Sequence, residues 1–351
     1  MSPLFTPVQI GRYSLPNRLV MAPMTRSRAD DHGIPSDLVV TYYAQRAGAG
    51  LIITEGVFPS AMGKGYVRTP GIATDEQIAV WKKVTAAVHA KGGRIFMQIM
   101  HCGRISHPSM LPNQAQPVAP SAIKAAGQTW TGAGMEEFVT PRELTLDEIA
   151  GVINEYRLAT RRAIDAGFDG VELHTASGYL PEQFLSSGSN QRQDQYGGSV
   201  ENRARFVLEV LAAMVAEVGG DRVGIKISPE MGFNDITDAN PQETYTYLVD
   251  QLRDLNLAYL HVALFGAKVD YHALLRPRFN GTYLIGGGLD QTGAEAVLSD
   301  SRADATVFGG AFLANPDLPE RFRQGAPLNT PDKNTFYSPG AEGYIDYPSL
   351  S

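Results

Sequence analysis

The chain has 351 residues, of which 43% are hydrophobic, and carries 36 glycines, 22 prolines and a formal net charge of −7. This composition is typical of a globular protein with many turns and excludes the fibrous and disordered classes. The acidic balance and the scattered Lys and Arg residues argue against nucleic acid or an anionic membrane as a partner, so small molecules are expected.

The sequence predicts a cytoplasmic protein without a membrane segment or a bound metal. No apolar run approaches the ~20 residues that span a bilayer, and the first residues lack the features of a secretory signal. Cys102 is the only cysteine, which excludes intrachain disulfides and cysteine-ligated zinc or iron–sulfur centres. The seven histidines show no metal-ligand spacing such as HExxH.

Short runs of aliphatic and β-branched residues recur along the chain. They lie at 17–23, 50–56, 94–100, 168–174, 222–228, 258–264, 281–287 and 305–310. Most are continuously apolar rather than alternating, as expected for parallel strands that are covered on both faces.

Amphipathic segments separate these runs, for example at 75–93, 145–167, 200–220 and 241–256. Several begin with Thr, Ser or Asp and end at Gly, as capped helices do. Eight alternating units without an additional block of strands predict a single α/β domain over residues 1–351, folded as a (β/α)8 barrel.

Two segments fall outside this alternation. Residues 8–18 alternate polar and apolar side chains around Gly11 and predict a small hairpin under the barrel. Residues 101–145, after the third strand, are too long and too rich in Pro, Gly, Ser and Gln for a simple connection. We expect this excursion to form a lid or a wall of the binding site.

Polar groups follow the predicted strands at their carboxyl ends, where barrel active sites lie. The strand ends supply Pro23, Met24, Thr25, Glu55, Gly56, Gln98, Met100, His101, His174 and Lys226. We therefore expect these residues to meet on one face of the barrel.

Glycines cluster after the last two strands, at Gly287 and Gly288 and at Gly309 and Gly310. Barrels often bind phosphate in these two loops, because only glycine lets the backbone approach the ligand closely. Turn glycines without a ligand are the alternative for each cluster alone, whereas the two clusters together favour phosphate.

Gln98 and Lys226 can each be interpreted in two ways. The Gln98 amide can pair with a planar heterocycle or serve as a core amide bonded to backbone. Lys226 closes a strand inside the barrel, where an unpaired ammonium is costly. Its partner is either an anionic ligand or a carboxylate such as Glu172 in a structural ion pair.

His174 ends its strand and is followed by a polar turn that carries Ser177 and Tyr179. A histidine and a hydroxyl can donate together to one substrate oxygen, and a phenol with a pKa of ~10 gives a proton only to a strong base such as an enolate carbon. A satisfied core histidine and a loop-packed aromatic are the structural alternatives.

Several long stretches carry a family resemblance. These are MAPMTRSRA, QIMHCGRISH, HTASGYLPEQFLSSGSNQRQDQYGGSVENRARF, ANPDLPERF and AEGYIDYP. In register over nearly the whole chain, the sequence resembles the old yellow enzyme family of FMN-dependent ene-reductases, and most of all its bacterial branch of the pentaerythritol tetranitrate reductase and N-ethylmaleimide reductase kind.

The resemblance implies an FMN site and a substrate site. The FMN ligands it implies are Pro23, Met24, Thr25, Gly56, Gln98, Lys226, Gly287, Gly288, Gly309 and Gly310. The catalytic residues it implies are His174, Ser177 and Tyr179, and the residues it implies for the substrate pocket are Tyr66, Met100, His174, Ser177, Phe336 and Tyr337.

The chemistry that the resemblance implies is a ping-pong cycle in one site. NADPH or NADH reduces the flavin, and the flavin then reduces an alkene conjugated to a carbonyl or nitro group, with Tyr179 as the proton donor. The protein is expected to be a monomer or a homodimer.

Three positions differ from the family pattern, and at two of them the chemistry of the side chain changes. Ser177 stands where the family has His or Asn, which shortens one donor to the substrate oxygen. Gly310 stands where the family usually has an Arg paired with the FMN phosphate, which predicts weaker cofactor binding. Lys226 replaces a usual Arg but keeps the positive charge.

Two further functions fit parts of the sequence. A flavin-free barrel lyase or aldolase would use Lys226 as a Schiff-base residue. A catalytically weak or retargeted flavin-binding barrel would explain Ser177 and Gly310.

Overall fold

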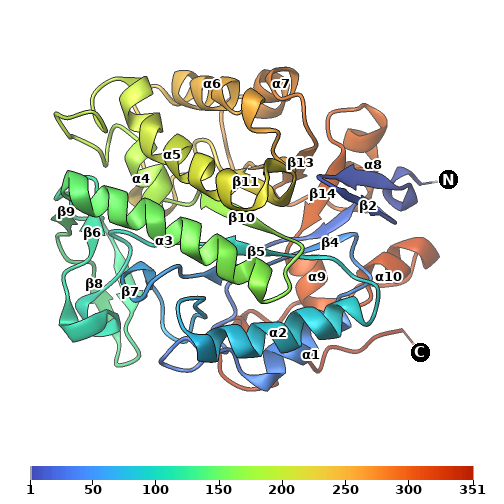
Figure 1. Cartoon of the computed structure of the whole chain (residues 1–351). Helices are drawn as coiled ribbons and strands as arrows, with labels where there is room; N and C mark the ends of the chain where they lie inside the picture. Colours follow the sequence, from blue (N-terminus) through green and yellow to red (C-terminus); the bar gives the residue numbers. More distant parts are fainter. Residues whose placement is uncertain (1, 351) are drawn as a thin grey trace.

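Eight parallel strands close into a barrel in the computed structural model, which describes residues 2–350 (Figure 1). Around the barrel these are β3 (Leu19–Met21), β4 (Leu51–Val57), β5 (Ile95–Ile99), β10 (Gly170–Thr175), β11 (Val223–Ile227), β12 (Tyr259–Ala263), β13 (Tyr283–Gly286) and β14 (Ala305–Phe308). β14 pairs with β3 and closes the ring. Each strand lies in one of the eight apolar runs or extends at most one residue beyond it, so the predicted (β/α)8 fold is confirmed.

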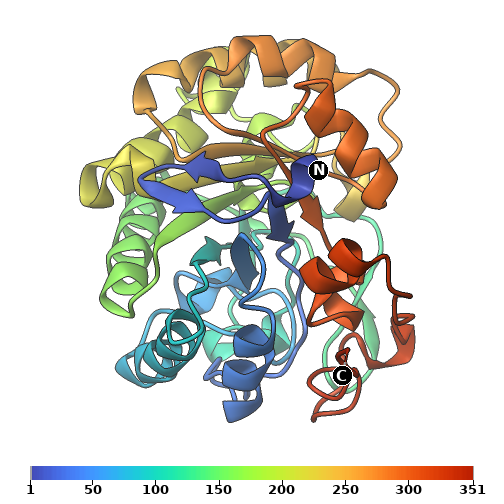
Figure 2. The same cartoon turned by 90° about the vertical axis from the view of Figure 1, so that its right-hand side faces the viewer.

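Helices surround the barrel (Figures 1 and 2). They are α1 (Asp37–Gln45), α2 (Asp75–His89), α3 (Leu146–Asp165), α4 (Leu180–Leu185), α5 (Val200–Val218), α6 (Pro241–Gln251), α7 (Tyr271–Leu275), α8 (Gln291–Ser299), α9 (Gly310–Ala314) and α10 (Leu318–Gln324). Thr74 and Thr145 begin α2 and α3 with complete capping boxes, as their sequences predicted.

The predicted N-terminal hairpin forms from β1 (Val8–Ile10) and β2 (Tyr13–Leu15), which pair in antiparallel register. Val8, Ile10 and Leu15 join a buried cluster with barrel side chains such as Phe96 and Tyr259. The turn residue Gly11 has φ 54, a backbone conformation that favours glycine. Figure 2 shows the hairpin lying across this end of the barrel.

The excursion after β5 lies at the other end of the molecule from the hairpin (Figure 1). It contains four short strands, β6 (Val118–Ala119), β7 (Gln128–Trp130), β8 (Met135–Glu137) and β9 (Arg142–Glu143). β7 and β8 form an antiparallel hairpin, and β6 pairs with β9 in parallel. The excursion therefore has structure of its own at the end where the strands have their carboxyl termini.

Single 3-10 turns complete the described elements. They lie at Pro3–Phe5, Ala61–Gly63, Pro108–Met110, Pro112–Gln114, Gly220–Arg222, Phe233–Asp235, Arg253–Leu255, Arg276–Arg278 and Lys333–Thr335. In the part of the chain that the structure describes, no helix has the length and apolar character needed to cross a bilayer.

Candidate active site

A cavity of about 840 Å³ opens where the barrel strands end. Most of the predicted site residues line it, from six strand ends, the segment after β4 and the C-terminal segment. They are Pro23, Met24, Thr25, Gly56, Tyr66, Gln98, Met100, His174, Ser177, Tyr179, Lys226, Gly310, Phe336 and Tyr337. The strand-end reasoning therefore brought together residues as far apart in the sequence as Pro23 and Gly310, and the family resemblance added Tyr66, Phe336 and Tyr337.

Three predicted phosphate-binding glycines do not line this cavity. Gly287 and Gly288 follow β13 with φ values of 123 and 81, and Gly309 follows β14. A Cβ on Gly309 would lie 3.6 Å from the sulfur of the cavity residue Met24, so Gly309 lies directly behind the cavity wall.

Gln98 belongs to a buried polar network. Its Nε2 donates to Glu172 Oε1 at 2.7 Å, and His261 Nδ1 lies 3.0 Å from Glu172 Oε2. Because a carboxylate only accepts, it fixes the Gln98 amide with its NH2 group toward Glu172, which leaves the amide oxygen available to a ligand donor. Gln98 is thus held by a carboxylate and not, as its structural alternative supposed, by backbone.

Lys226 forms no ion pair within 4.0 Å in the described part of the chain. Burial lowers the pKa of its ammonium, against the raising effect of the charges on Glu172 and Glu182. The expected alternative of a Lys226–Glu172 ion pair is therefore wrong, because Gln98 and His261 occupy the two oxygens of Glu172. The ammonium lines the cavity instead.

His174 lies next to the tyrosine pair of the cavity, one residue before the end of β10, because the strand continues to Thr175. Its ring stands edge-on to Tyr179, with centroids 4.9 Å apart and planes at 84°. Burial, and then the charges of Lys226 and His261, hold the pKa of His174 well below its ordinary value, so the imidazole is neutral at pH 7. Its Nδ1 is buried without a hydrogen-bond partner among residues 2–350, as expected where a ligand supplies the partner.

The Tyr179 hydroxyl lies 2.9 Å from the Tyr66 hydroxyl, and the two rings meet edge-on. Burial raises the pKa of both phenols, so both stay protonated at neutral pH. Each phenol therefore keeps its proton in the cavity wall.

Ser177 lies in the left-handed region of backbone space, with φ 59. Its Oγ is 3.5 Å from Met231 Sδ, a weak acceptor, so the hydroxyl has no strong partner among the residues that the structure describes. Its backbone is fixed from both sides, because its N–H donates to Ser228 Oγ and its carbonyl accepts from Asn234 Nδ2.

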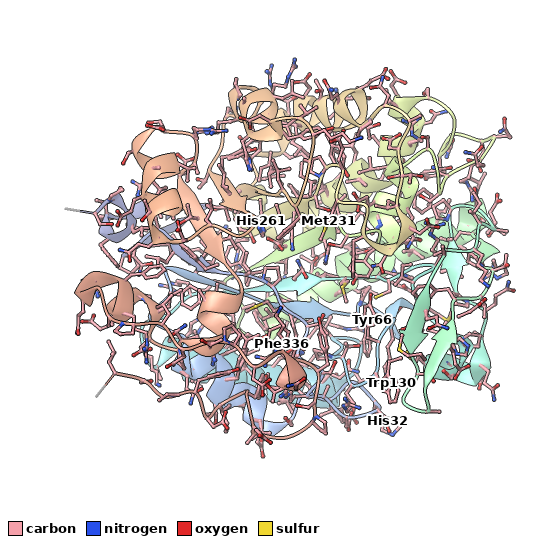
Figure 3. All side chains as sticks on the ribbon, turned by 180° about the vertical axis from the view of Figure 1, so that it is seen from behind. His32, Tyr66, Trp130, Met231, His261 and Phe336 are labelled. Carbon is pink, nitrogen blue, oxygen red and sulfur yellow. The ribbon has the colours of Figure 1, made fainter. Side chains whose placement is uncertain are left out.

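Residues that the sequence did not single out also line the cavity. Met231, Phe233 and Asn234 follow β11, and Trp130 lies on the β7–β8 hairpin. Figure 3 labels Met231, Tyr66, Phe336 and Trp130. The loop after β11 could have been found by the strand-end rule, and Trp130 lies in the excursion that was predicted to form a wall.

The residues present fit a flat cofactor with a polar edge. The Thr25 hydroxyl, the Gln98 amide and the Lys226 ammonium share one cavity with the backbone of Pro23 and Gly56. A Cβ on Gly56 would fall 2.5 Å from the Met100 sulfur, so a larger residue here would displace the Met100 side chain. This donor and acceptor set complements a heterocycle such as an isoalloxazine ring.

The barrel and its cavity define an oxidoreductase of the flavin-binding barrel class. The family model of the NADH:flavin oxidoreductase / NADH oxidase family matches residues 3–329. The chain belongs to this family, and it is an enzyme that uses FMN.

Similar proteins cover the whole chain. The structure of morphinone reductase in complex with tetrahydroNAD is 50% identical, with a TM-score of 0.95 over 100% of this chain and 98% of that one. The old yellow enzyme homologue from Zymomonas mobilis is 37% identical, with a TM-score of 0.96 over 99% of both chains. The 12-oxophytodienoate reductase 1 of Oryza sativa subsp. japonica is 44% identical over 359 residues, 99% of this chain and 93% of the relative.

The resemblance to the old yellow enzyme family is thereby confirmed. The flavin-free lyase or aldolase is wrong, because family membership requires FMN in the cavity where Lys226 lies.

Proposed function

We propose that the enzyme reduces carbon–carbon double bonds conjugated to a carbonyl, imide or nitro group, with NADPH or NADH as the reductant. The names of the relatives support this reaction, since morphinone reductase and 12-oxophytodienoate reductase are reductases of this kind. The observation that carries the proposal is the buried, neutral His174, whose Nδ1 has no protein partner in the described residues and which lies against the protonated Tyr179.

FMN would lie across the strand ends. Thr25, Gln98 and Lys226 would hold the polar edge of its ring, and the backbone of Pro23, Met24 and Gly56 would contact the ring. The loops with Gly287, Gly288, Gly309 and Gly310 would hold the phosphate. When bound, FMN accepts a hydride from the nicotinamide and passes a hydride to the alkene.

His174 and Ser177 would bind the substrate oxygen. A neutral imidazole donates one hydrogen bond. The Ser177 hydroxyl, which within residues 2–350 hydrogen-bonds to the Met231 sulfur alone, is free to donate a second to the substrate. Both donors withdraw electron density from the conjugated double bond, and they act more strongly in a buried site than in water.

Tyr179 would protonate the α-carbon of the substrate. Its pKa is raised by burial, so the phenol keeps its proton until a strongly basic carbon forms beside it. Tyr66, 2.9 Å away, orients the Tyr179 hydroxyl and can return a proton to it. Met100, Phe336 and Tyr337 would complete the substrate pocket with apolar surface.

We further propose that the chain acts as one domain over residues 1–351, as a monomer or a homodimer in the cytoplasm. The closed barrel supports one domain, because strands from both halves of the chain share one ring.

A substrate panel tests the function. Enones, nitroalkenes and maleimides are offered to the wild type and to Tyr179→Phe with both nicotinamides. Wild-type turnover is expected, with enone turnover lost in the variant and nitroalkene turnover kept, because a nitronate can take its proton from water. Wild type without turnover of any of these acceptors would refute the proposal.

A further inference from the structure

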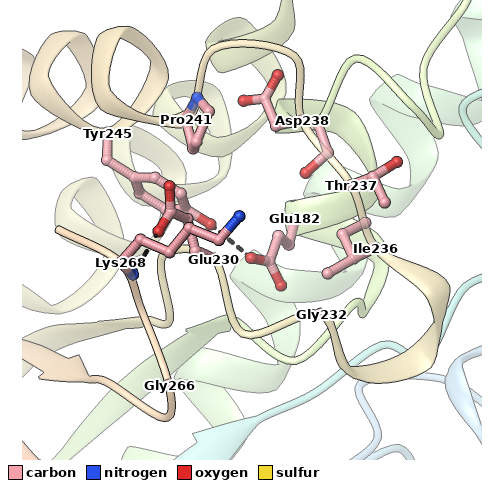
Figure 4. A pocket seen from close by; sticks show the side chains of 11 residues that line it. Glu182, Glu230, Gly232, Ile236, Thr237, Asp238, Pro241, Tyr245, Gly266 and Lys268 are labelled. Atoms are coloured by element: carbon pink, nitrogen blue, oxygen red, sulfur yellow. Dashed lines mark hydrogen bonds between the residues drawn. The ribbon is translucent and has the colours of Figure 1, made fainter.

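Glu182 is a buried carboxyl group directly behind the loop that carries Ser177 and Tyr179. It lies in the first turn of α4 and is 2% exposed. Its Oε2 accepts the Gly178 N–H at 2.7 Å, and its Oε1 accepts the Tyr245 hydroxyl at 2.5 Å. Figure 4 shows Tyr245 reaching Glu182 from α6.

The Glu182 contact differs from an ordinary helix cap. Tyr179 is the N-cap of α4, and an acidic residue at the third helical position usually reaches back to the N-cap N–H. Glu182 instead bonds to the residue before the cap, which lies between the two proposed substrate-contacting side chains. The carboxylate therefore acts on the backbone of the active-site loop as well as on the helix.

This loop needs external support. Ser177 and Gly178 have φ values of 59 and 77, two successive residues in a region that is costly for an L residue such as serine. Ser228 Oγ and Asn234 Nδ2 hold the backbone of Ser177. Glu182 accepts from the Gly178 N–H, and Gln183 Nε2 donates to the Gly178 carbonyl at 2.8 Å. Among these supports, Glu182 is the one that can change its charge. Removing the Glu182 acceptor would leave the Gly178 N–H buried without that partner.

Charged and titratable groups reach Glu182 from several elements. Tyr245 faces it from α6, Asp238 from the loop before α6, and Lys226 from β11. Glu230 and Lys268 share with it a cavity of about 350 Å³ on its far side (Figure 4). Burial raises the pKa of Glu182 to about 7, against the lowering effect of the bonds from Tyr245 and Gly178.

We propose that Glu182 is a positioning residue, whose carboxylate, held by Tyr245, fixes the Ser177–Tyr179 loop for substrate binding and loosens it on protonation. This inference deepens the proposed function, on which it rests for the roles of Ser177 and Tyr179. Glu182 itself does not line the substrate cavity.

The expected pH dependence follows from the two states of the carboxyl group. Above about pH 7 the carboxylate accepts both hydrogen bonds with its full charge. As the pH falls through about 7, protonation replaces a charged acceptor with a neutral one, and the bond to the Gly178 N–H weakens. Alkene reduction should then slow toward acid pH, whereas Glu182→Gln, which mimics the protonated acid, should lack this inflection.

The Tyr245→Phe variant distinguishes an effect of the Glu182 charge from an effect of Glu182 on packing. The Tyr245 hydroxyl lowers the pKa of Glu182, so its loss should move the inflection to higher pH without abolishing it. A purely structural role for Glu182 would reduce activity equally at all pH values in both variants.

Hydrogen–deuterium exchange of the purified holoenzyme tests the contact independently of turnover. In peptides that contain Gly178, exchange at pH 8 is expected to be about tenfold faster in Glu182→Gln than in wild type, and the two should converge at pH 6. Glu209→Gln is the matched control, because Glu209 also accepts from a tyrosine, Tyr196 at 2.7 Å, but on α5. It should match wild type at both pH values.

Equal exchange in wild type and Glu182→Gln at pH 8, or an unchanged activity profile in that variant, would overturn the inference. A wild type that reduces no alkene would refute the proposed function instead, while the exchange difference could still be present. The two failures are therefore distinguishable.

Discussion

Ser177 combines a short side chain with a backbone conformation that asparagine tolerates better than most residues. In the described part of the chain its hydroxyl has the weak acceptor Met231 Sδ as its hydrogen-bond partner, so the proposed substrate oxygen would displace no stronger one. The serine hydroxyl extends less far into the cavity than the imidazole or amide that the resemblance implies for this position.

Ser177→Asn is expected to raise kcat/KM for simple enones by about tenfold, since removal of a whole oxyanion-type donor costs on the order of 10²–10³. Steady-state kinetics with 2-cyclohexenone measure this. Ser177→Ala should lower kcat/KM, which shows that the serine hydroxyl itself contributes. Unchanged kinetics in both variants would mean that the position does not touch the substrate oxygen.

Gly310 begins α9 and lines the cavity without any side chain. A Cβ at this position would have Pro331 Cγ, at 3.7 Å, as its nearest neighbour, so a larger residue has room. Gly310→Arg should tighten FMN binding by about tenfold or more, because a charge-assisted hydrogen bond contributes roughly 1.5–3 kcal/mol.

Titration of apoprotein with FMN, followed by the quenching of flavin fluorescence, gives the two dissociation constants. Gly310→Ala serves as the control and should bind FMN like the wild type. If the arginine and alanine variants bind FMN equally, the phosphate does not lie at this loop.

At the scale of elements, the excursion after β5 carries its apolar side chains to the rim of the cavity. Trp130 on β7 and Met135 on β8 are 49% and 57% exposed, and both line the mouth. Exposed large apolar residues that gather at a cavity mark a binding surface.

Trp130→Ala is therefore expected to raise KM for polycyclic enones by about tenfold, because a large apolar contact of a few kcal/mol at most is lost. KM for N-ethylmaleimide should be unchanged, since a small acceptor stays deep in the cavity. Equal effects on both substrates would place Trp130 in a purely structural role.

The eight strands could be predicted because each lies in a mainly apolar run and is buried from its first residue to its last apart from Lys226. The strands β6 to β9 and the helices α4 and α9 are too short to show a hydrophobic period in the sequence. The strand-end rule found His174, Gln98 and Lys226, which lie one residue before the ends of β10, β5 and β11.

Contacts between side chains could not be predicted in the same way. The Lys226–Glu172 pair was a sound alternative from charge alone, but His261 and Gln98, from two other strands, take the carboxylate. The roles of Met231 and Glu182 likewise depend on loops that only the closed barrel brings together.

At the scale of the whole molecule, buried histidines lower the free energy of unfolding at acid pH. Burial lowers the pKa of His101 from 6.5 to about 4, and its Nδ1 accepts the Gly103 N–H at 3.1 Å. Between these two pKa values the unfolded chain binds a proton that the folded protein does not, so the free energy of unfolding falls as the pH falls from about 6.5 to about 4.

His101→Asn keeps an acceptor near the Nδ1 position and removes the titration. Urea unfolding at a series of pH values should show wild type losing stability relative to this variant by up to about 1.4 kcal/mol per pH unit below pH 6.5. Parallel stability curves would mean that His101 is solvated in the folded protein. Burial raises the pKa of Glu55 to about 7, so its contribution to the free energy of unfolding is lost as the pH rises toward 7. This dependence has the opposite sign to that of His101 and is the same in wild type and variant.

The central claim is that one cavity at the barrel mouth serves both the nicotinamide and the alkene through a bound flavin. Anaerobic addition of NADPH or NADH to the purified yellow protein, followed by 2-cyclohexenone or a maleimide, tests it most directly by flavin absorbance. The account predicts bleaching by the nicotinamide and full return of the colour with the alkene. If oxygen restores the colour of the reduced protein but none of the alkenes does, the account is contradicted.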